Sequence, residues 1–130
     1  MLILWVAAGS AVGGLARFFV SGLVARAIGE TFPWGTMVVN ITGAFGIGVL
    51  AALARRQGLL IFPEAWSIAA TGLLGSYTTV SSFSLQTLAL AREGEWLRAA
   101  GNIVLSLALC LGAAALGMAA ALEAAGESGL

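Results

Sequence analysis

The chain has 130 residues, of which 60% are hydrophobic and only 9% are charged, and its formal net charge is zero. A soluble domain of this size has too high a surface-to-volume ratio to hide so much apolar surface, and soluble chains carry roughly a quarter charged residues. Six arginines balance six glutamates, so no basic patch favours nucleic acid as a partner. The composition predicts an integral membrane protein.

Charged residues divide the chain into four long apolar segments. Each has about the 20 residues that a helix needs to cross the hydrocarbon core of a bilayer. No segment shows the alternation with period two that is typical of barrel strands. We therefore expect an all-α, multi-pass membrane protein with one four-helix transmembrane domain. The predicted spans are residues 2–25, 34–54, 65–91 and 99–122.

The first segment carries Arg17, the one charge inside any predicted span. Two placements of this side chain stay open. Its long stem can reach the nearer membrane interface, or its guanidinium can face a water-filled vestibule and raise the local anion concentration. Gly9 and Gly13 in the same segment are four residues apart, a spacing that lets helices approach closely in lipid.

Polar residues of the second and fourth segments occur in pairs four residues apart. Thr36 and Asn40 share one face of the second predicted helix, and Asn102 and Ser106 share one face of the fourth. Polar side chains at membrane depth usually face protein or water. For any single residue, hydrogen bonding between helices is the simpler interpretation. Polar stripes on three helices together favour a polar pathway.

The third segment has a different composition at its centre. Residues 72–79 read GLLGSYTT, and this mixture of glycine and β-branched residues weakens a helix. Its hydroxyl groups can bond the carbonyls that a break releases. We expect a helix break here, which membrane depth permits only where protein or water surrounds it. Thr79, Ser82, Phe83 and Gln86 follow helical spacing and are predicted to form one stripe.

Missing residue types narrow the function. No predicted span contains a carboxylate or a histidine, which a proton-coupled exporter or an enzyme would need. Amides, hydroxyls and the positive edge of an aromatic ring suit the passive movement of an anion. A small dual-topology drug or cation exporter is the rival interpretation, but that class requires a carboxylate in the first helix. A noncatalytic subunit of a larger membrane complex also stays open.

Three sequence strings resemble one known family. They are GGLARF at 13–18, PWGTMVVN at 33–40 and GLLGSYTTVSSFS at 72–84, and in this order they resemble the helices of the Fluc (CrcB) fluoride channels. The resemblance implies a passive fluoride channel, not an enzyme, that exports fluoride across the inner (plasma) membrane and relieves fluoride toxicity. It also implies an antiparallel, dual-topology homodimer.

The same resemblance implies roles for individual residues. Asn40 would line the fluoride path, and Phe83 would present its ring edge to the ion beside a polar track of Ser81 and Ser82. Val80 stands where the family usually has a second phenylalanine. The expected ion pathway comprises Arg17, Asn40, Thr79, Val80, Ser81, Ser82 and Phe83.

A bound cation is the last expectation from the resemblance. The family holds a structural sodium ion at the centre of its dimer through backbone carbonyls at the third-helix break. The matching positions in this chain are Gly75 and Thr78. Backbone oxygens can coordinate such an ion without a formal charge.

Overall fold

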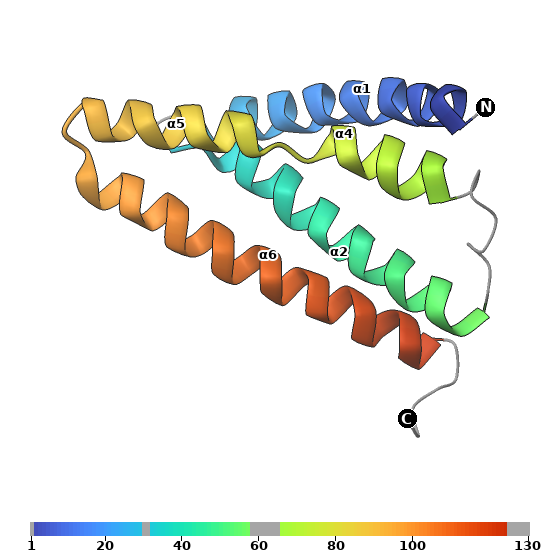
Figure 1. Cartoon of the computed structure of the whole chain (residues 1–130). Helices are drawn as coiled ribbons and strands as arrows, with labels where there is room; N and C mark the ends of the chain where they lie inside the picture. The colour runs from blue at the N-terminus through green and yellow to red at the C-terminus, as the bar shows by residue number, and fades with distance from the viewer. Residues whose placement is uncertain (1, 30–31, 58–65, 125–130) are drawn as a thin grey trace.

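The computed structural model describes residues 2–29, 32–57 and 66–124, and all regular elements in these ranges are helices. Four rods run up and down beside one another, and the third rod is built from three helical pieces (Figure 1). The elements are α1 (Leu2–Ile28), α2 (Trp34–Gln57), the π-helix η1 (Ser67–Leu74), α4 (Gly75–Tyr77), α5 (Val80–Arg92) and α6 (Trp96–Ala124).

Three of these helices are long and apolar enough to cross a membrane. They are Leu2–Ile28, Trp34–Leu53 and Trp96–Glu123, and at most 33% of the most apolar part of each is buried within the chain. Large apolar side chains cover the outside, among them Leu97 at 87% and Ile3 at 80% exposure. A surface of this kind is stable only against lipid or another apolar surface. The protein is therefore an all-α membrane protein.

The segment expected as the third span, residues 65–91, corresponds to η1, α4 and most of α5, except for residue 65, which lies outside the described residues. α1 packs along η1 and α4, whereas α2 packs mainly on α6. The third rod therefore lies beside α1 in its first half, and α5 turns toward α6 in its second half (Figure 1).

Two glycines with positive φ, Gly29 and Gly94, end the helices α1 and α5. Gly94 has φ +80°, and the amides of Gly94 and Glu95 donate to the carbonyls of Ala91 and Leu90 at 3.1 and 2.9 Å. This is the paired bonding that ends a helix with a left-handed residue. Gly29, with φ +97°, ends α1, and its amide donates to the Ala25 carbonyl at 2.8 Å.

Glycines inside the helices allow backbones to touch. A Cβ on Gly9 or Gly13 of α1 would clash with the backbone of η1 around Leu73. On the other side of the bundle, a Cβ on Gly48 would clash with the Ala114 carbonyl, and one on Gly117 with the Phe45 carbonyl. Lipid provides no hydrophobic force between helices, so close backbone packing of this kind holds them together.

A glycine pair on α1 offers a direct test of this packing. Gly13→Ala should destabilise the protein by roughly 1–3 kcal/mol, because the added methyl group must displace the η1 backbone. Gly14→Ala is the matched control, since nothing lies within 4 Å of a Cβ at that position. Thermal unfolding in detergent should give a lower midpoint for the first variant alone, and equal midpoints would contradict this packing.

Candidate functional site

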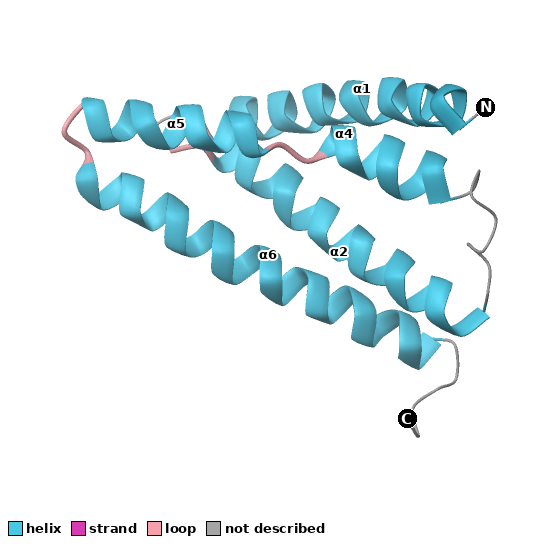
Figure 2. Cartoon of the chain, in the orientation of Figure 1, coloured by secondary structure: helices cyan, strands magenta, loops and turns pink. Residues whose placement is uncertain are grey.

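Two extended residues interrupt the third rod. α4 ends at Tyr77, Thr78 has φ −82° and ψ 159°, Thr79 has φ −152° and ψ 120°, and α5 begins at Val80. Figure 2 shows this interruption as a short loop between two helical segments. Extended residues cannot continue the bonding pattern of a helix, so carbonyls before the break and amides after it lose their normal partners.

The side chain of Asn40 on α2 binds the break at two points. Its Nδ2 donates to the Thr79 carbonyl at 3.0 Å, and its Oδ1 accepts from the Thr79 amide at 2.8 Å. The reverse orientation of the amide is excluded, because it would place Nδ2 against the Thr79 amide, both donors, and Oδ1 against the Thr79 carbonyl, both acceptors. Asn40 thus gives an extended residue the pair of bonds that a neighbouring strand would give it.

The side chain of Thr79 caps α5. Its Oγ1 accepts from the Ser82 amide at 3.1 Å and lies 3.2 Å from Ser81 Oγ. A threonine in extended conformation, with its oxygen on the amide three residues ahead, is a standard helix N-cap. Before the break, the amide and hydroxyl of Thr78 both donate to the Leu74 carbonyl, at 3.1 and 3.0 Å.

The break changes the bonding of the carbonyls of residues 75–78, which in an unbroken helix would accept from the amides of residues 79–82. In an unbroken helix the Thr79 amide would donate to the Gly75 carbonyl, and the Ser82 amide to the Thr78 carbonyl. Here the Thr79 amide donates to Asn40 Oδ1 and the Ser82 amide to Thr79 Oγ1. The carbonyls of Gly75 and Thr78 are therefore available to another partner.

A second contact fixes the helix just before the break. Thr42 Oγ1 donates to the Val38 carbonyl at 2.8 Å and lies 2.8 Å from the Tyr77 hydroxyl, so the tyrosine is the donor of that second bond. Gly43, the next residue of α2, allows the approach, because a Cβ there would clash with the methyl group of Thr78. α2 thus holds the chain on both sides of the break.

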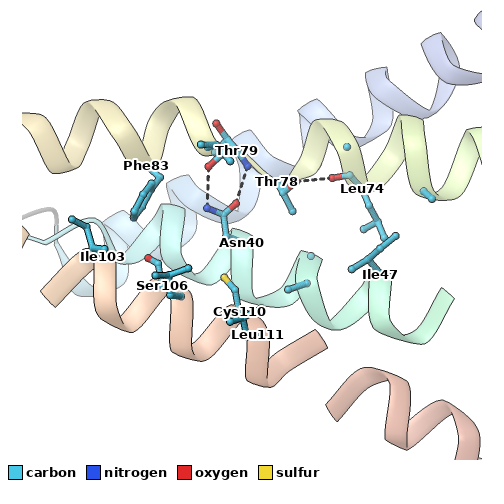
Figure 3. A pocket seen from close by; sticks show the side chains of 16 residues that line it. Asn40, Ile47, Leu74, Thr78, Thr79, Phe83, Ile103, Ser106, Cys110 and Leu111 are labelled. Carbon is cyan, nitrogen blue, oxygen red and sulfur yellow. Dashed lines mark hydrogen bonds between the residues drawn. The ribbon is translucent and has the colours of Figure 1, made fainter. Parts of the chain in front are cut away.

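A cavity of about 580 Å³, here called the break cavity, opens beside the break between α2, α6 and the third rod, from η1 to α5. Asn40, Thr79 and Phe83 line it together with side chains of α6, including Ser106 and Cys110 (Figure 3). Of the residues expected on the ion pathway, it gathers Asn40, Thr79, Val80 and Phe83. Gly75 and Thr78 line it as well.

A second cavity, of about 700 Å³, lies between α1, α2 and α5 and is called the α1–α5 cavity here. Ser82 and Gln86 line it from α5, and Thr36 lines it from α2. The predicted single stripe of Thr79, Ser82, Phe83 and Gln86 was therefore wrong. Thr79 precedes α5 as its cap, and the other three residues point to two different cavities.

Two expected pathway residues line neither cavity. Ser81 is exposed on the protomer surface, with its hydroxyl beside that of Thr79. Arg17 is half-buried and shares a helical stripe with Gly13 and Ser21, which pack against Leu73 of η1 and Gly35 of α2. Arg17 thus belongs to the side of α1 that contacts the bundle, and the structure brings it to neither cavity.

A series of hydrogen bonds between polar groups joins α5 to α6 about one helical turn after Phe83. Asn102, 2% exposed, donates through Nδ2 to Thr87 Oγ1 at 2.8 Å, and Thr87 donates to the Phe83 carbonyl at 2.7 Å. The spacing of Asn102 and Ser106 indicated a polar face on α6, but no sequence pattern identified Thr87 as its partner. These bonds fix the helical turn that carries the Phe83 ring.

The cap of α5 gives a prediction with a conservative control. Thr79→Val keeps the branched shape but removes the oxygen that accepts from the Ser82 amide, so it should lower the unfolding free energy by about 1–2 kcal/mol. Thr79→Ser keeps that oxygen and should stay near the parent. Chemical or thermal unfolding in detergent measures both variants, and equal losses in the two would contradict the assigned capping role.

The fold is that of an all-α membrane protein whose third rod is interrupted at a point that the Asn40 side chain bonds. The profile of the family described as CrcB-like protein, Camphor Resistance (CrcB), matches residues 4–118. The chain belongs to this family.

Curated relatives support the same membership. The chain is 62% identical over 120 residues, 92% of each chain, to "Fluoride-specific ion channel FluC 2" of Rhodopseudomonas palustris. It is 56% identical over 116 residues to a protein of the same name from Bradyrhizobium diazoefficiens, covering 88% of this chain and 85% of that one. It is 54% identical over 121 residues to "Fluoride-specific ion channel FluC" of Opitutus terrae, covering 92% of each.

Proposed function

We propose that this protein is a passive fluoride channel, not an enzyme, which exports fluoride across the cell's plasma membrane and so relieves fluoride toxicity. The observation that carries the proposal is its 62% identity, along 92% of its length, to a protein named as a fluoride-specific ion channel. The break cavity is lined mainly by apolar side chains, to which Asn40 adds an amide, Ser106 a hydroxyl and Phe83 an aromatic edge. These neutral groups, with no carboxylate among the described lining residues, support the proposal.

Fluoride is small and strongly hydrated, so its path must replace water with several hydrogen-bond donors in sequence. One N–H of Asn40 Nδ2 binds the Thr79 carbonyl, and the other is free to face the break cavity that Asn40 lines. The Phe83 ring in the same cavity supplies a weakly positive edge. Fixed neutral groups of this kind take up no proton, so transport needs no coupling and follows the fluoride gradient.

The proposal includes four membrane crossings. Three helices meet the length and hydropathy requirement by themselves, and η1, α4 and α5 together would form the fourth crossing, broken at its centre. The bonds from Asn40, Thr42 and Thr79 support this assignment, because a broken helix at membrane depth needs protein groups to satisfy its backbone.

The proposed assembly is an antiparallel homodimer of dual topology. With four crossings, Arg55 and Arg56 would lie on one side of the membrane and Arg26, Arg92 and Arg98 on the other. Three arginines on one side and two on the other are nearly balanced, so the positive-inside rule does not favour either orientation of the chain. The apolar opening of the break cavity and the 75% exposure of Val80 beside it fit a surface that a second copy covers.

A structural sodium ion at the centre of this dimer is part of the proposal. The carbonyls of Gly75 and Thr78 would hold it, since the amides that a continuous helix would donate to them bind elsewhere. Such an ion would add a positive charge near the anion path. It would also join the two breaks across the dimer axis.

Fluoride efflux from proteoliposomes tests the function. With valinomycin present to dissipate the potential, a fluoride electrode should record rapid efflux down the gradient without any imposed proton gradient. Chloride loaded in the same way should leave far more slowly. Efflux of chloride as fast as fluoride, or fluoride movement that depends on a proton gradient, would each refute the proposal.

The single ring of the break cavity gives a second expectation. Phe83→Ile should cut fluoride efflux severely, because an aliphatic side chain has no positive ring edge. Val80→Phe should be tolerated, because the family that this chain resembles usually has a phenylalanine at this position. The same electrode assay compares the two variants, and unchanged efflux in Phe83→Ile would exclude this ring from the pathway.

Dual topology is tested by labelling the turn between α5 and α6. Glu93 is exposed there, so Glu93→Cys in a Cys110→Ala chain gives one accessible thiol. A membrane-impermeant maleimide applied to intact cells should label about half of the molecules, since each orientation is equally populated. Detergent-permeabilised cells give the total. Labelling of nearly all or nearly none of the molecules would contradict dual topology.

A further inference from the structure

α4 is the shortest piece of the third rod. It comprises only Gly75–Tyr77, and it lies between the π-helix η1 and the extended residue Thr78, which has φ −82° and ψ 159°. At its start, the Gly75 amide is shared between the carbonyls of Ala70 and Gly72, five and three residues earlier. A single helical turn between irregular neighbours has little stability of its own. Contacts from the neighbouring helices must therefore fix its direction.

Tyr77 makes the one side-chain hydrogen bond that joins α4 to another helix within residues 2–29, 32–57 and 66–124. Its hydroxyl lies 2.8 Å from Thr42 Oγ1, and it is the donor because Thr42 donates its own proton to the Val38 carbonyl at 2.8 Å. The Tyr77 ring faces Gly43, since a Cβ on that glycine would lie 3.3 Å from the ring carbon Cδ2. Tyr77 thus holds α4 on α2 through both its ring and its hydroxyl.

Asn40 and Thr42 contact the third rod from two sides of α2. They are two positions apart in the chain, which is about 200° around a helix, and Gly43 lies between them on the helix surface. Asn40 lines the break cavity, whereas Thr42 and Tyr77 line neither of the two cavities. Water in those cavities therefore does not reach the Tyr77 hydroxyl, and lipid offers it no partner. Nothing replaces this bond when it is lost.

The carbonyls of Gly75 and Thr78 move with α4. Gly75 is the first residue of that turn, and Thr78 follows its last residue. The bonds from Asn40 fix the chain only beyond Thr78, at the carbonyl and amide of Thr79. The position of both carbonyls relative to α2 therefore depends on Tyr77. Carbonyl oxygens bind a monovalent cation only when they are held together around it.

We infer that Tyr77 is a positioning residue for the break, whose hydroxyl, through Thr42, holds the carbonyls of Gly75 and Thr78 where the proposed sodium ion requires them. The inference rests on the sodium ion of the proposed function. It adds to that proposal two hydroxyl groups that lie on no expected ion pathway. Removal of either hydroxyl should weaken sodium binding, although neither is an ion ligand.

Equilibrium dialysis of the purified protein against radioactive sodium, with choline keeping the ionic strength constant, tests this role without depending on transport. Tyr77→Phe keeps the ring on Gly43 and loses only the hydroxyl. It should raise the dissociation constant for sodium about threefold, the factor that corresponds to a typical hydrogen bond between membrane helices. A merely structural role would lower the number of binding sites per chain and leave the dissociation constant unchanged. An unchanged dissociation constant in Tyr77→Phe would overturn the inference.

Variants at Thr42 supply the matched controls. Thr42→Val keeps the branched shape and should raise the dissociation constant by the same factor as Tyr77→Phe. The double variant should bind no more weakly than either single one, because the two hydroxyls act through one bond. Thr42→Ser keeps the acceptor oxygen and should bind sodium like the parent. Additive losses in the double variant, or equal losses in Thr42→Ser and Thr42→Val, would contradict the assigned role.

The outcomes separate this inference from the proposed function. If the parent chain binds sodium and Tyr77→Phe binds it equally well, the positioning role is wrong and the sodium site stands. If the parent chain binds no sodium, the proposed sodium ion fails and the positioning role fails with it, whereas fluoride efflux from the parent still decides the channel proposal. Weaker binding in Tyr77→Phe and Thr42→Val, with parent-like binding in Thr42→Ser, supports the inference.

Discussion

The two hydrogen bonds between the Asn40 side chain and the Thr79 backbone are the constraint on which the rest of the site depends. Backbone polar groups at membrane depth must find protein partners, since lipid provides none. A chain with two extended residues inside a helix leaves several such groups unpaired. Asn40 satisfies the amide and carbonyl of one of them, at 2.8 and 3.0 Å, and so allows the break to exist.

The break then determines the electrostatics around it. The Thr79 amide bonds Asn40, and the Ser82 amide bonds Thr79, so the carbonyls of Gly75 and Thr78 do not accept from these amides as they would in a continuous helix. The same two residues line the break cavity on which the anion path is proposed. One arrangement of neutral groups thus positions both the proposed cation ligands and the lining of the proposed anion path. No titratable residue is required, which fits passive transport.

Much of the fold could be predicted from the sequence because the membrane imposes simple rules. Apolar segments of sufficient length and their boundaries indicated the long helices, and the spacing of Gly9 and Gly13 indicated a close helix contact, which η1 provides. The composition of residues 72–79 indicated a weak point in the third helix, and the extended residues Thr78 and Thr79 lie within it.

The arrangement of side chains around the break could not be predicted in the same way. Helical spacing grouped Thr79 with Ser82, Phe83 and Gln86, but that spacing applies only within a continuous helix, and Thr79 lies before the first turn of α5. The two hydrogen bonds from Asn40 to Thr79 require α2 to pack closely against the break. Gly43 permits this approach, because a Cβ there would clash with Thr78. Gln86 Oε1 is buried and has no hydrogen-bond partner among the described residues. Its surroundings depend on how three helices pack, and a single sequence does not contain that information.

Amide hydrogen exchange at Thr79 tests the central claim most directly. In the parent protein, reconstituted in lipid nanodiscs and measured by NMR, the Thr79 amide should exchange slowly because it donates to Asn40 Oδ1. In Asn40→Ala it should exchange much faster, while amides in the middle of α2 and α6 keep their protection. Equal protection of the Thr79 amide in the two proteins would show that Asn40 does not hold the break.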